Sequence, residues 1–281
     1  MTRPKPKTAQ DQVMPLPLWS VPMRIAVVIG VMVGALLLAV ALSNAADPTA
    51  HGTLVARILS GVVISTLVIA VIAILGRWTG QHSLRAAGFT TASGDVQAFC
   101  LGIAAWTVPA AAAFFVLALF GSPLQITAPA TEFWLVFGLL LPAVLLAEAI
   151  PEELVFRGYV SAVLAERLAP WRVIGVQSAL FVAAAILLRG EANLLDVSLF
   201  AAMGFVLGYV RLVTGSVWTA VGIHVAFQTA SQLVFTHRVI EFGGSPELAM
   251  FALGAVPFTA AAILLPLLVA WKTPPTNNLK V

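Results

Sequence analysis

Long apolar runs separated by short polar connections dominate the chain. Eight runs of about 16 to 23 residues cover 25–42, 58–75, 98–120, 133–150, 173–188, 195–210, 217–235 and 249–271. Each run is close to the roughly 20 residues that a helix needs to cross a bilayer. The alternation of apolar and polar residues that is typical of strands in a membrane barrel is absent. The pattern predicts an all-α, polytopic transmembrane helical bundle of about eight spans.

The composition agrees with a membrane protein of one domain. Of all residues, 60% are hydrophobic and 10% are charged, whereas a soluble domain is nearer to a quarter charged. We expect a cytoplasmic tail over residues 1–20, a single transmembrane domain over 21–271 and a C-terminal tail over 272–281. The longest polar connection, residues 76–97, is too short to fold as a further domain.

The positive charges predict the orientation. If both termini are cytoplasmic, 12 of the 15 Lys and Arg residues lie inside and Arg57, Arg189 and Arg238 lie outside. An excess of positive charge on cytoplasmic connections is the rule for membrane proteins. We therefore expect an integral protein of the lipid bilayer, in the plasma (inner) membrane if the source is bacterial. No clustered basic face indicates a nucleic acid partner, and Cys100 alone supplies neither a disulfide nor a cysteine metal site.

A group of charged residues stands at the end of the fourth run. Glu153 and Arg157 are four residues apart and can pair on one helix face, whereas Glu152 is turned about 100° away from Glu153. Glu148 shares the face of Glu152 if the helix continues through Pro151, and two such carboxylates could hold one proton between them. Two interpretations stay open: the charges mark the cytoplasmic end of the span, or they form a functional site.

A second polar group lies inside the seventh run. His224 is surrounded by apolar residues, and Gln228 follows four residues later on the same helix face. This pair could donate hydrogen bonds to a developing oxyanion. The alternative is a histidine that bonds across helices and stabilises their packing. With the acidic stretch in the same bundle, a polar site is a hypothesis that the sequence supports.

These residues resemble a known pattern. Glu152-Glu153-x-x-x-Arg157-Gly158 is followed by an apolar span with Phe181 and then by a span with His224 and a polar residue four positions later. The pattern is similar to the CAAX-processing and bacteriocin-processing (CPBP) family of intramembrane endopeptidases. The likeness covers about residues 133–235, and the first three spans lie outside the motifs.

The resemblance implies an activity and a role for each motif residue. Glu152 would be the general base that activates water, Glu153 and Arg157 a supporting pair, and His224 an oxyanion donor. Gln228 stands where the family usually has Asn, which is one methylene shorter. The implied reaction is cleavage of a peptide bond near the cytoplasmic membrane face. Its substrate would be a membrane-associated peptide or protein, which the family associates with prenylation.

Ala185 departs from the family pattern. The family has a histidine four residues after the phenylalanine of its second motif, and this chain has Ala185 there. A catalytic zinc normally takes three protein ligands, and Glu152 with His224 supplies two. Ala185 therefore disfavours zinc or another divalent metal. Loss of an acid–base partner typically lowers a rate about 10²- to 10⁴-fold.

Three hypotheses follow from the sequence. The first is a membrane-embedded endopeptidase in which Glu152 activates water. The second is a catalytically inactive family member that binds a membrane protein or peptide. The third is a proton-coupled transporter in which Glu152 carries the proton, which is disfavoured because such transporters are commonly built from repeats and the acidic stretch has no second copy.

Overall fold

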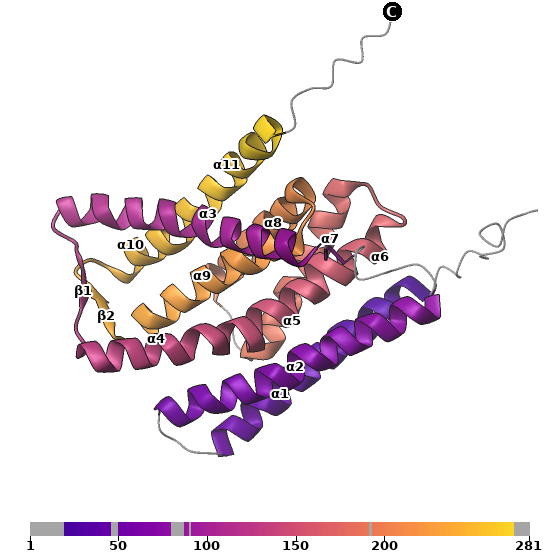
Figure 1. Cartoon of the computed structure of the whole chain (residues 1–281), viewed down its shortest axis with the longest axis horizontal. Helices are drawn as coiled ribbons and strands as arrows, with labels where there is room; N and C mark the ends of the chain where they lie inside the picture. The colour runs from indigo at the N-terminus through magenta and orange to yellow at the C-terminus, as the bar shows by residue number, and fades with distance from the viewer. Residues whose placement is uncertain (1–19, 46–49, 80–86, 90, 191–192, 273–281) are drawn as a thin grey trace, which may run out of the picture.

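The computed structural model describes residues 20–45, 50–79, 87–89, 91–190 and 193–272, and most of them are helical (Figure 1). The helical elements are α1 (Ser20–Ala45), α2 (Ala50–Thr79), α3 (Ala92–Leu119), α4 (Ala130–Val144), η2 (Leu145–Ala149), α5 (Ile150–Glu153), η3 (Leu154–Val160), α6 (Ser161–Ala165), α7 (Pro170–Arg189), α8 (Leu194–Thr214), α9 (Val217–Phe235), α10 (Pro246–Met250), η4 (Phe251–Ala255) and α11 (Val256–Lys272). Two short strands, β1 (Leu124–Ile126) and β2 (Ile240–Phe242), pair antiparallel. The prediction of an all-α polytopic bundle is confirmed.

Seven helical segments in the described part of the chain are long and apolar enough to cross a membrane, where the sequence predicted about eight spans. The predicted span without a counterpart among the seven is the seventh run, residues 217–235, which forms helix α9. His224, Gln228 and Gln232 lower its mean hydropathy. His224 is buried in the bundle, and Gln228 and Gln232 donate hydrogen bonds to Glu148, so these polar side chains contact protein.

The acidic stretch lies inside a helical segment that runs from Ala130 to Ala165. Pro151 lacks a backbone N–H and would normally bend or end a helix, but here the π-helical turns η2 and η3 flank it and the helix continues. The hydroxyl of Ser161 donates to the Phe156 carbonyl at 2.8 Å in the second of these turns. The helix therefore does not end at these charges, and Glu153 and Arg157 are buried inside the bundle.

Two glycines bring α9 into the centre of the bundle. A Cβ atom on Gly102 of α3 would lie 2.2 Å from the Thr219 carbonyl oxygen of α9. One on Gly222 of α9 would lie 2.2 Å from the Phe99 carbonyl oxygen of α3. Real Cβ atoms do not approach backbone so closely, so the two helices can cross here because both positions are glycine.

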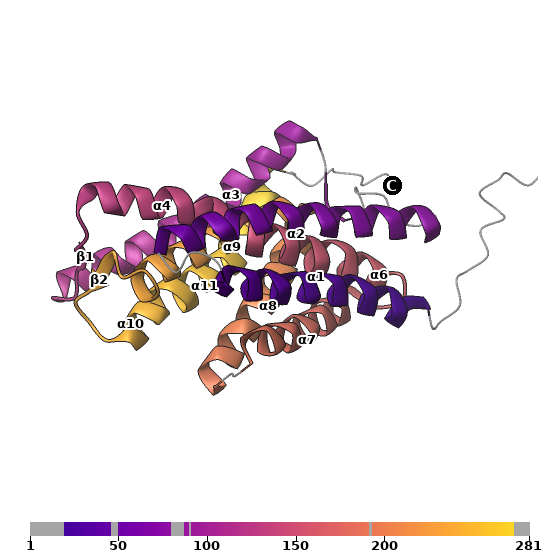
Figure 2. The same cartoon turned by 90° about the horizontal axis from the view of Figure 1, so that it is seen from below.

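The connections between helices gather at two ends of the bundle. At one end, which we call the strand end, β1 pairs with β2 (Figures 1 and 2). His51 contacts Glu132 at 3.0 Å at this end. At the other, the basic end, Arg24 pairs with Glu166 at 3.2 Å. Each of these contacts joins connections that the sequence analysis assigned to the same side of the membrane.

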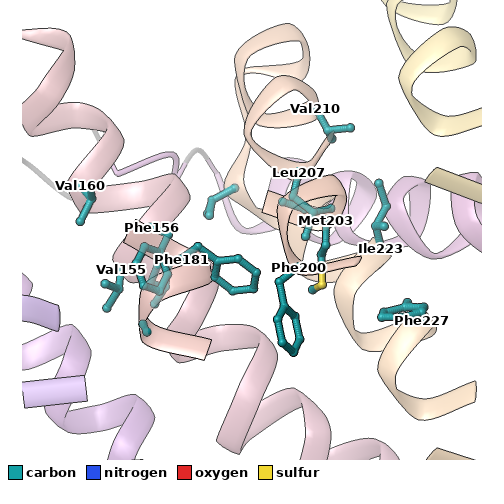
Figure 3. Close-up of a cluster of buried hydrophobic side chains, with 14 of the residues drawn as sticks. Val155, Phe156, Val160, Phe181, Phe200, Met203, Leu207, Val210, Ile223 and Phe227 are labelled. Carbon is teal, nitrogen blue, oxygen red and sulfur yellow. The ribbon is translucent and has the colours of Figure 1, made fainter. Parts of the chain in front are cut away.

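Aromatic side chains form the core beside the acidic stretch. The ring of Phe181 in α7 lies between Phe156 of η3 and Phe200 of α8, with centroid separations of 5.3 and 6.5 Å (Figure 3). Met203 and Phe227 belong to the same buried cluster. This packing holds η3, α7, α8 and α9 together around the charged residues.

Candidate active site

Glu153 is the fully buried acid of the pair, with an exposed fraction of 0%. Its Oε1 atom accepts a hydrogen bond from Arg157 Nη1 at 2.9 Å and lies 2.8 Å from His224 Nδ1. The predicted i,i+4 pair between Glu153 and Arg157 is present. A buried carboxylate is expensive unless it is paired and hydrogen-bonded, and here a cation and an imidazole share one oxygen of it.

Arg157 is held from three directions although it too is fully buried. Its Nη2 atom donates to the carbonyl oxygens of Met203 at 3.3 Å and Gly204 at 3.4 Å, both on α8. Its guanidinium carbon lies 4.4 Å from the centroid of the Phe181 ring, a cation–π contact. Arg157 therefore fixes Glu153 relative to α7 and α8.

Glu152 has different surroundings, as its offset along the helix predicts. Its side chain is 17% exposed, and its Oε2 atom lies 4.0 Å from His224 Nε2. His224 is 1% exposed and thus stands between the two acids, with one ring nitrogen facing each. The contact of Nδ1 with Glu153 sets the orientation of the imidazole ring and leaves Nε2 for chemistry at Glu152.

A second polar layer surrounds Glu148. This carboxylate forms an ion pair with Arg57 of α2 and accepts hydrogen bonds from Gln228 Nε2 at 3.2 Å and Gln232 Nε2 at 3.3 Å. Arg57 also donates to Gln232 Oε1 at 3.0 Å. Glu148 thus contacts one cation and two amides. These contacts do not support the hypothesis that Glu148 and Glu152 share a proton.

Sequence reasoning missed Arg57 and Gln232. Arg57 was assigned to a connection because the second apolar run begins at residue 58, whereas α2 begins at Ala50 and carries Arg57 into the bundle. Gln232 had a usable signal, because it follows His224 and Gln228 at the same spacing of four. Three polar residues at that spacing on an apolar helix indicate a polar face.

The motif residues converge on one cavity of about 710 Å³, which Glu152, His224, Gln228 and Ala185 all line. Glu153 and Arg157 do not line this cavity, and Arg157 lines a smaller one of about 320 Å³. The cavity extends from the middle of the bundle toward the strand end, since its other lining residues stand in the halves of their helices nearest that end. Examples are Val40, Thr53, Ser60, Leu188, Leu199 and Ser231.

The residues around the cavity do not fit a metal ion. In the described part of the chain, no three His, Cys, Asp or Glu side chains are arranged to hold one. Glu153, the nearest further carboxylate to Glu152 and His224, directs Oε1 at the Arg157 guanidinium and His224 Nδ1. A cation would compete with that guanidinium for the same oxygen.

Comparison with known proteins agrees with the motif pattern. Residues 132–230 match a family model described as Type II CAAX prenyl endopeptidase Rce1-like. A search of curated proteins and a search of solved structures gave no match. The matched segment contains Glu152, Glu153, Arg157, Ala185 and His224. Residues 132–230 thus carry the signature of the Rce1-like, CAAX-type endopeptidase family that the motifs indicated.

Proposed function

We propose that this protein is an intramembrane endopeptidase of the CAAX-processing type, with Glu152 as the general base. One observation carries the proposal: of the two adjacent acids, Glu152 faces a cavity and stands 4.0 Å from His224 Nε2, while Glu153 is buried behind them. The substrate is a membrane-associated peptide or protein. The family match supports this class of reaction.

The separation of Glu152 and His224 suits the activation of water. Two atoms 4.0 Å apart can each lie about 2.8 Å from a single water oxygen, which is hydrogen-bond distance. Glu152 takes a proton from this water while its oxygen attacks the carbonyl carbon of the peptide bond. The amide nitrogen then receives that proton as the C–N bond breaks, which yields a carboxylate and an amine.

His224 stabilises the charge that develops on the carbonyl oxygen. In the imidazolium form both ring nitrogens carry hydrogen, so Nδ1 donates to Glu153 Oε1 and holds the ring in place, while Nε2 is left to donate to the carbonyl oxygen. A donor that is held in position before the reaction stabilises an oxyanion without reorganising in the transition state. We assign Gln228 as a positioning residue, because its amide nitrogen donates to Glu148.

The first experiment removes the base. Glu152→Gln in the purified protein, reconstituted in lipid, should lower cleavage of quenched-fluorescent membrane peptides by at least about 100-fold, because general acid–base catalysis contributes 10²- to 10⁴-fold. The matched control is Glu132→Gln, the same change in an acid at the strand end, which should leave the rate unchanged. Equal rates for Glu152→Gln and the unmodified protein would refute the proposal.

A second candidate is a catalytically inactive member that binds a membrane peptide. Ala185 favours it, because this methyl group lines the cavity where the family has a histidine. If the unmodified protein binds peptides from the same set without cleaving them, and Ala185→His creates cleavage that Glu152→Gln abolishes, the inactive candidate is correct. Ala185→Asn provides a control for polarity, because its amide is no acid or base.

A further inference from the structure

The cavity leads toward one end of the bundle, and therefore toward one face of the membrane. Arg189 and Asp196 line it, and they stand at the end of α7 and the start of α8, on either side of the short connection between these helices. Thr53 lines it from the first turn of α2. All three positions belong to the strand end. A smaller cavity of about 320 Å³, lined by Ser161 among others, occupies the basic end instead.

The two ends of the bundle differ in charge. Arg24, Arg77, Arg167, Arg172 and Arg211 stand at the basic end, at the ends of α1, α2, α6, α7 and α8. The strand end carries four acids, namely Glu132, Asp196, Glu241 and Glu247, with two arginines outside the spans, Arg189 and Arg238. The positive-inside rule therefore places the basic end in the cytoplasm.

The structure corrects two residues in this count without reversing it. Arg157 is fully buried beside Glu153, so it leaves the predicted cytoplasmic set. Arg57 is inside α2 and paired with Glu148, so it leaves the opposite set. Buried, paired charges do not anchor a connection on one side of a membrane. What remains of the 12 to 3 split is 11 to 2, so the asymmetry is as strong as before.

We propose that the catalytic cavity opens toward the extracytoplasmic side of the membrane, so that the substrate is a membrane-anchored peptide or protein approached from that side. Cleavage by this cavity rests on the proposed function, but its sidedness does not. Cytoplasmic termini and cleavage near the cytoplasmic face, both expected from the sequence, are incompatible with a cavity that leads to the strand end. The charge distribution supports the first of these expectations, that the termini of this chain are cytoplasmic. The cavity then faces away from the cytoplasm, which makes prenylated C-termini of cytoplasmic proteins poor substrates.

The walls of the cavity fit a substrate segment that has one apolar part and one polar part. Leu36 and Val40 of α1 face Leu199 and Phe200 of α8 as apolar walls, since all four line the same cavity. Arg189 lies at its strand end, where it pairs with Asp196 at 3.4 Å and is 52% exposed. A substrate that leaves the bilayer at this point would place its polar continuation beside Arg189.

Thiol labelling tests the sidedness without requiring activity. In a Cys100→Ala background, single cysteines replace two partly buried serines of similar setting: Ser231→Cys in the catalytic cavity and Ser161→Cys in the cavity at the basic end. A charged, membrane-impermeant thiol reagent is applied to spheroplasts and to inside-out vesicles. The fraction labelled after detergent solubilisation gives the total reactive thiol for each variant.

We expect Ser231→Cys to react at least about tenfold faster in spheroplasts than in inside-out vesicles, and Ser161→Cys to show the reverse preference. The proposal is overturned if Ser231→Cys reacts faster in inside-out vesicles, equally in both preparations, or only after solubilisation. Because neither thiol takes part in catalysis, this result is independent of the Glu152→Gln assay. Sidedness and endopeptidase activity can thus fail separately.

Discussion

Arg157 contacts Glu153, the α8 backbone and the Phe181 ring. Arg157→Met keeps much of the volume but leaves the Glu153 carboxylate buried without its cation. Removal of one partner of a buried ion pair costs about 3–5 kcal/mol. We expect a loss of this size in the free energy of unfolding, measured as a lower melting temperature in detergent.

Two further variants separate charge from volume in this prediction. Arg172→Met, at the exposed start of α7, should change stability by less than about 0.5 kcal/mol. Glu153→Gln added to Arg157→Met removes the uncompensated charge and should recover part of the loss. Arg157→Lys should not restore full stability, because an ammonium group cannot reproduce the guanidinium's stacking and forked hydrogen bonds. If the double variant is no more stable than Arg157→Met, buried charge is not the cause.

At the scale of elements, the apolar runs predicted the bounds of a helix well where the helix is continuous and regular. The predicted run 217–235 has the bounds of α9, and the run 173–188 lies within α7. The fourth run failed, because Pro151 and the charges after residue 150 have the local features of a span end. What keeps this segment helical and buried is supplied from elsewhere, by Arg57 of α2 and His224 of α9.

For the candidate site, too, the local geometry was predictable from the sequence and the long-range contacts were not. The spacing of Glu152, Glu153 and Arg157 predicts one paired acid and one acid on another face, and the structure has this arrangement. The partners of Glu148 could not be predicted, because they are 91 residues before it and 80 or more after it in the chain. Contacts at such separations depend on which helices pack together, and a local pattern contains no information on that.

At the scale of the whole molecule, the side of the membrane on which the C-terminus lies depends on whether α9 crosses the membrane. Seven crossings would place the termini on opposite sides of the membrane, and eight would place them on the same side. The apolar composition of α9 is too low for it to count among the seven, yet its polar residues contact Arg57, Glu148 and Glu153 inside the bundle. Polar residues in a span are tolerated when they face protein.

We therefore predict that α9 crosses the membrane and that both termini are cytoplasmic. Full-length chains with green fluorescent protein at either terminus should fluoresce in bacterial cells, and alkaline phosphatase at the C-terminus should be inactive, because it folds only outside the cytoplasm. Phosphatase fused after Gly190, at the end of α7, is the control and should be active. An active phosphatase at the C-terminus would mean that α9 does not cross, and it would place the end of α11 on the same side as the strand end.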